Sequence, residues 1–133
     1  MSENNVINRI ELDLHQDDKT QKTYILRQCD LSLSLAYASD GGSKPAMDAH
    51  LSGSTVTMPD NLLLNWVANS PGEWSGELRI YYENQEIPQV HITFHQSSVN
   101  SYSQSFSEGS NYGHEGYFAV MLKGVTINDV KMS

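Results

Sequence analysis

His91 and His95 are four residues apart, a spacing that would place two metal ligands on one side of a helix. The residues around them alternate instead, with apolar side chains such as Val90 and Phe94 between polar ones, and this is the pattern of a β-strand. On a strand, four residues span about 13 Å, so the two imidazoles point to one side but cannot reach the same ion. The spacing therefore predicts a polar strand face and no metal site.

Other reactive side chains also lack partners in sequence. Cys29 follows Arg27 and could be an activated thiolate, although a small core thiol is the interpretation we favour. Serines are abundant, but no Gly-x-Ser-x-Gly nucleophile motif is present. The segment Gly41–Lys44 lacks the spacing of a phosphate-binding loop. We therefore expect no catalytic residues, no metal and no cofactor, and we predict that the protein is not an enzyme.

Length and charge restrict the function further. A chain of 133 residues is expected to form a single domain over 1–133, with residues 1–6 as a frayed end. The net charge is −8 and the few basic residues are spread along the sequence, which argues against nucleic acid and anionic membranes as partners. The charged first twenty residues contain no apolar leader and the chain has a single cysteine. These features predict a protein that folds in the cytoplasm and does not insert into a membrane.

Most of the chain has the period of β-strands. Alternating apolar residues predict strands over 9–14, 23–38, 46–57 and 99–106, and a hairpin formed by 73–82 and 87–97. The segment 114–127 is apolar on both faces, with Phe118 on one and Tyr117 on the other. We expect both faces of this strand to be buried, the inner one in a barrel and the outer one under a helix or another subunit.

One segment, 58–70, has helical spacing. Pro59 and Asp60 suit a first turn, and Asn69 to Gly72 stop the helix, which gives one short helix of about ten residues. Its apolar positions share one face, which we expect to pack against the core: Leu62, Leu63, Trp66 and Val67. The predicted fold class is mainly β with one short α-helix.

The order of these elements resembles that of a known family. A Cys29-x-Leu-x-Leu strand is followed by a polar loop ending at Pro45, another strand, and the helix with Leu-Leu-x-x-Trp66. The strand beginning at Gly76 and the segment 99–106 continue the match, which covers about residues 10 to 128. The sequence thereby resembles the Hcp (haemolysin-coregulated protein, TssD) tube proteins of type VI secretion systems, in the version found in Bacteroidetes.

The resemblance implies a small β-barrel of two packed antiparallel sheets flanked by one helix. It implies homohexameric rings that stack into a tube inside a contractile sheath, with spike and baseplate proteins as further partners and effector proteins carried in the lumen. Such a subunit is cytoplasmic before assembly and is then secreted without a signal peptide. By the same resemblance, one loop reaches the adjoining ring: Ser39, Asp40, Gly41, Gly42, Ser43, Lys44 and Pro45.

Two other functions remain open from the sequence. The first is a monomeric ligand-binding small β-barrel, or another oligomeric β-domain, and the monomeric barrel requires a sizeable apolar pocket. The second is an enzyme on a small β-scaffold that uses His91 or His95 as general base.

Overall fold

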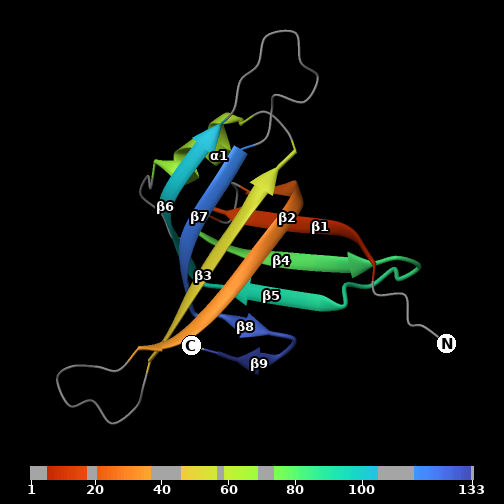
Figure 1. Cartoon of the computed structure of the whole chain (residues 1–133). Helices are drawn as coiled ribbons and strands as arrows, with labels where there is room; N and C mark the ends of the chain where they lie inside the picture. Colours follow the sequence, from red (N-terminus) through yellow and green to blue (C-terminus); the bar gives the residue numbers. More distant parts are fainter. Residues whose placement is uncertain are drawn as a thin grey trace, which may run out of the picture.

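The computed structural model describes residues 6–17, 21–36, 46–56, 59–68, 74–104 and 116–132 (Figure 1). These residues form one antiparallel sheet and one helix. The elements are β1 (Ile7–His15), β2 (Gln21–Ala36), β3 (Ala46–Thr55), α1 (Asn61–Val67), β4 (Ser75–Tyr82), β5 (Val90–Phe94), β6 (Gln96–Gln104), β7 (Gly116–Lys123), β8 (Thr126–Ile127) and β9 (Val130–Lys131). The prediction of a mainly β protein with one short helix is confirmed.

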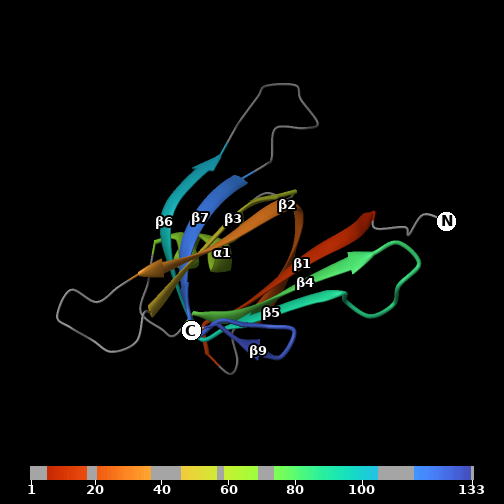
Figure 2. The ribbon, with the colours of Figure 1, turned by 60° about the horizontal axis from the view of Figure 1, so that its bottom comes forward.

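The sheet has the strand order β6-β7-β3-β2-β1-β4-β5-β8-β9, with every neighbouring pair antiparallel. It folds over on itself to form two layers (Figure 2). The first layer contains β6, β7, β3 and the second half of β2. The second layer contains the first half of β2 with β1, β4, β5, β8 and β9. The two predicted sheets are therefore parts of one continuous sheet.

Three irregular positions allow the strands to pass between the layers. In β2, a bulge at Arg27 lies where the strand leaves β1 and continues beside β3. A bend at His95 separates β5 from β6, and its backbone N–H donates to the carbonyl of Lys123, 2.9 Å away. Beside it, Gly124 has a φ of +69° between β7 and β8. The prediction of one strand over 87–97 was wrong, because the chain turns at His95 into the other layer.

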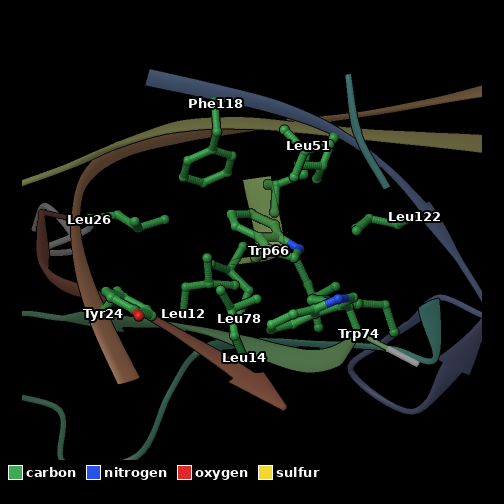
Figure 3. Close-up of a cluster of buried hydrophobic side chains, with 14 of the residues drawn as sticks. Leu12, Leu14, Tyr24, Leu26, Leu51, Trp66, Trp74, Leu78, Phe118 and Leu122 are labelled. Atoms are coloured by element: carbon green, nitrogen blue, oxygen red, sulfur yellow. The ribbon is translucent and has the colours of Figure 1, made fainter. Parts of the chain in front are cut away.

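The core lies between the layers and follows the two-residue period. Leu12, Leu78 and Ile92 are paired across β1, β4 and β5 and are at most 3% exposed. Trp66 reaches between the layers from α1, and its ring meets that of Phe118 edge to face at a centroid distance of 5.2 Å (Figure 3). Large side chains therefore fill the space between the two layers.

Helix α1 is shorter than the predicted ten residues, since it contains seven. Asp60 precedes the helix as its N-cap and accepts a hydrogen bond from the backbone N–H of Leu63 at 2.9 Å. The same carboxylate accepts from the hydroxyl of Tyr24 at 2.7 Å and from the ammonium group of Lys22. These bonds attach the start of the helix to β2. The described part of the chain contains no helix that is long and apolar enough to span a membrane.

The position of α1 corrects one expectation about the segment 114–127. The helix lies on the side of β7 that carries Phe118, so it does not cover the opposite face of the strand. Tyr117 on that face is 41% exposed, and Met121 is half-buried. Within a single copy, only one face of this strand is fully buried.

The C-terminal hairpin of β8 and β9 was not predicted from the sequence. Its turn contains Asn128 and Asp129, with φ values of 47° and 71°. Positive φ at both central residues is typical of the type I′ turns that connect two-residue hairpins. The turn signal was therefore present in the sequence, although asparagine and aspartate replace the more common glycine.

Candidate assembly surfaces

The predicted inter-ring loop, Ser39 to Pro45, lies outside the described residues. The strands that it connects are described: β2 ends at Ala36, and β3 begins at Ala46 in register with it. Of the predicted packing residues of α1, Leu63 and Trp66 are each 1% exposed, while Leu62 and Val67 are half-buried. Trp66 extends from the helix into the core, where its ring contacts Phe118 of the first layer (Figure 3).

The sequence candidates for chemistry are not brought together. The ring of His91 bonds to a carboxylate on β4, whereas His95 is exposed at the bend after β5. Cys29 is half-buried, and burial together with the charge of Asp30 raises the pKa of its thiol. Among the described residues, no group of three or more histidine, cysteine or carboxylate side chains is placed to hold a metal ion.

A network of charges covers the outer face of β1, β4 and β5. The guanidinium group of Arg79 bonds to Glu11 at 3.1 Å, Asp13 at 2.6 Å and Glu77 at 3.0 Å. Glu77 also accepts from the ring of His91 at 2.9 Å, and this bond is the main reason that its pKa is lowered. A single guanidinium group therefore holds three carboxylates, and its positive charge offsets part of the negative charge of this face.

Burial alone would raise the pKa of Asp13 in this network. Hydrogen bonds from Arg79 and from the hydroxyl of Thr23 outweigh that effect, and the pKa is lowered. The carboxylate of Asp13 therefore joins β1 to both β4 and β2, and the network stabilises the second layer.

The outer face of the first layer has a different composition. Cross-strand register places many serines of β6, β3 and β2 on this face, of which Ser54 is buried and the others are exposed or half-buried: Ser98, Ser101, Ser103, Ser52, Ser54, Ser32 and Ser34. Between them, β7 contributes Tyr117, Ala119 and Met121. We call this surface the serine face. The same register places Asp30, Asp48, His50 and Lys123 on this face, so charged side chains are scattered among the serines.

The first layer ends in two edges that no described strand covers. At one end, β6 pairs only with β7, which leaves its outer side as the β6 edge. At the other end, β1 pairs with β2 only as far as Leu26, so residues 28–36 of β2 pair with β3 on one side alone. The other side of residues 28–36 is the β2 edge. Edge strands of this length are templates for pairing with another strand.

The opposite end of the sheet is protected. Asn128, in the turn of the C-terminal hairpin, bonds to the outer side of β5 through both its backbone and its side chain. Its backbone N–H donates to the carbonyl of His91 at 2.8 Å, and its Oδ1 accepts from the N–H of His91 at 2.7 Å. Its Nδ2 also donates to the carbonyl of Gln89 at 3.3 Å. A single side chain therefore replaces part of a neighbouring strand, and the last strand, β9, has only two residues.

Comparison with known proteins identifies solved structures that share this architecture. No protein-family model matches the sequence, and no curated protein does so either. Solved structures do match. Hcp1 from Flavobacterium johnsoniae superimposes with a TM-score of 0.68 at 12% identity, covering 93% of this chain and 98% of that one. A type six secretion system protein gives a TM-score of 0.64 at 16% identity, covering 90% and 82%.

A chain of the PVC sheath–tube complex, an extracellular contractile injection system in its extended state, matches with a TM-score of 0.57 at 13% identity, covering 90% of this chain and 88% of that one. Identities this low establish a shared fold and leave the role of the protein to be argued separately. The architecture predicted from the resemblance is thus confirmed, and the chain has the fold of Hcp proteins.

Proposed function

We propose that this chain is the tube subunit of a contractile injection system of the type VI class. Six copies form a ring, and rings stack into a tube that is expelled with effector proteins in its lumen. The role is structural and includes no catalytic step. Support comes from the matches to Hcp1 and to a chain of a sheath–tube complex. Sheath, spike and baseplate proteins follow as partners, and secretion proceeds through the apparatus without a signal peptide.

The pair of open edges carries the proposal. The first layer contains four strands, so the antiparallel alternation makes β6 and β2 run in opposite directions. The β6 edge of one copy can therefore pair with the β2 edge of the next copy, and the antiparallel alternation continues across the junction. Repeated with a rotation that closes, this head-to-tail contact gives a ring in which the first layer has no free edge.

The serine face suits the channel of such a ring. The core and the whole second layer lie on the other side of the first layer (Figure 2). Outside the ring there is more room for the second layer than inside, so ring closure turns the serine face toward the axis. The serines of this face give a moving cargo few strong contacts.

The loop Ser39–Pro45 is proposed to make the contact between stacked rings. It follows the paired ends of β2 and β3, which extend away from the body of the molecule (Figure 1). Deletion of residues 40–44 is expected to leave rings intact and to weaken tube formation. Tubes of unchanged length and number in electron micrographs would show that another segment connects the rings.

Light scattering on a sizing column, with negative-stain images of the same peak, tests the ring itself. Six copies of a 14.9 kDa chain give about 89 kDa and annular particles. A monomer that persists at high protein concentration contradicts the proposal. It would favour the ligand-binding barrel, although Trp66, Phe118 and Leu78 already occupy the space between the layers (Figure 3).

A further inference from the structure

The apolar face of the second layer extends beyond the part that the first layer covers. On its inner side, Leu12 of β1 and its partners Leu78 and Ile92 are almost completely buried. In the next row along the strands, Ile10 of β1 is still only 6% exposed. Its cross-strand partners in that row, Ile80 of β4 and Val90 of β5, are half-buried. Burial therefore decreases along each strand toward this end.

The last row of this face is the least covered. Ile7 is 49% exposed and pairs with Tyr82, which is half-buried. We call Ile7, Ile80, Tyr82 and Val90 the apolar shelf. Ile80, Tyr82 and Val90 continue the alternation of the core residues, and an irregularity of β1 between Ile7 and Arg9 brings Ile7 opposite Tyr82. The four residues therefore belong to a surface suited to burial. Single exposed apolar residues are common on proteins, whereas a row that continues the core stripe indicates a covering partner.

The position of the shelf indicates which partner covers it. Strand β2 leaves β1 after Leu26, which is paired with Ile10, so the shelf begins where β2 turns into the first layer. Both views show the ends of β1 and β4 reaching past β2 (Figures 1 and 2). The shelf therefore borders the β2 edge, and a strand added to that edge would bring the rest of its own molecule over the shelf.

We propose that the apolar shelf is the docking surface for the β6 side of a second copy of this chain. That side carries α1 packed against β6, with Trp66 bonded to Ser97 at 2.9 Å and Leu64 exposed at 44% on the outer side of the helix. The proposal rests on the proposed ring, and it adds a hydrophobic contact to the backbone pairing of the two edges. Directional backbone bonds set the register, while the shelf supplies apolar burial.

Neighbouring tyrosines on β4 provide a matched test. Tyr82 belongs to the shelf, while Tyr81 faces the other way and lies under the guanidinium group of Arg9, 4.2 Å from its ring centre. Tyr82→Ser is expected to raise the protein concentration at which rings half-dissociate by about thirtyfold or more, as the loss of a central aromatic contact does. Tyr81→Ser is expected to leave that concentration within about threefold of the unsubstituted protein.

Photocrosslinking tests the same contact without removing an aromatic ring. Benzoylphenylalanine at position 82 should form crosslinks between two copies, which peptide mapping places in 61–68 or 96–104, and the same group at position 81 should not. Rings that survive Tyr82→Ser at unchanged concentration, or crosslinks that map elsewhere, overturn the shelf and leave the tube proposal standing. An unsubstituted protein that is monomeric at all concentrations overturns both.

Discussion

The serine hydroxyls of Ser97 and Ser54 are expected to differ strongly in their effect on stability. Both residues are buried, at 8% and 1% exposed, and both lie in the first layer. The Oγ of Ser97 accepts from Nε1 of Trp66 at 2.9 Å and donates to the carbonyl of Trp74 at 2.8 Å. The Oγ of Ser54 is buried and has no hydrogen-bond partner in the described part of the chain.

Replacing Ser97 by alanine leaves two buried polar groups without a partner. The indole N–H of Trp66 and the carbonyl of Trp74 lie in residues that are 1% and 3% exposed, so water cannot replace the bond easily. Each unsatisfied group costs about 1 to 3 kcal/mol, and removal of the hydroxyl offsets part of the sum. We expect Ser97→Ala to lower the free energy of unfolding by about 2 to 4 kcal/mol.

Replacing Ser54 by alanine removes a hydroxyl that bonds to none of the described residues. The expected change is within about 0.5 kcal/mol of zero, or a small gain in stability. Urea unfolding followed by tryptophan fluorescence measures both variants, and equal protomer concentrations keep any contribution of oligomerisation constant. Similar losses in the two variants, or a larger loss for Ser54→Ala, would refute the reasoning, because burial alone would then explain the cost.

Three further predictions concern single residues. Gly124→Ala should destabilise the fold by at least about 2 kcal/mol, since its φ is +69° and a Cβ would lie 2.3 Å from the ring of His95; an unchanged urea midpoint would contradict this. The pKa of Glu77 is lowered from 4.5, mainly by His91, so Glu77→Gln should reduce the free energy of unfolding at pH 7. The difference in free energy between the variant and the unsubstituted protein should vanish as the pH falls below about 4.5 and through the lowered pKa of the folded state. A difference that persists at pH 2.5 would exclude this cause. At pH 8, iodoacetamide should label Cys29 at least about tenfold more slowly than in the urea-unfolded chain, because burial raises the pKa of the thiol, and equal rates would show that the thiol is accessible.

Local patterns predicted the elements of the fold well. The alternation of Leu12 with polar neighbours places β1 correctly, and the apolar spacing around Trp66 identifies the helix. The break at His95 could not be predicted, because it depends on Gly124, almost thirty residues away. The imidazole ring of His95 lies where a side chain at position 124 would be, so this position requires a glycine. The exposure of Tyr117 depends in the same way on the side of the sheet that α1 occupies, and no local signal fixes that side.

The candidate assembly surfaces were less accessible to sequence reasoning. An edge strand is defined by its position in the sheet, whereas the amino-acid sequence of β6 is that of an ordinary polar strand. The sequence does not reveal the apolar shelf either, because Ile80 and Tyr82 continue the same alternation as the buried Leu78. The alternation predicts which face a residue occupies, but the length over which the opposite layer covers that face is a tertiary property.

The two ends of the sheet differ in how much open strand edge they offer, and this difference favours a head-to-tail contact between copies. Asn128 covers part of the outer side of β5, and the terminal strand β9 has only two residues, so this end offers little backbone for strand addition. Pairing of two β6 edges about a two-fold axis is sterically simple, but it leaves the β2 edge and the adjoining apolar shelf of both copies open to water. Only the head-to-tail pairing of the β6 edge with the β2 edge uses both in every copy and covers the shelf at the same time. In the proposed closed ring, neither the β6 edge nor the β2 edge of any copy is left available for further pairing.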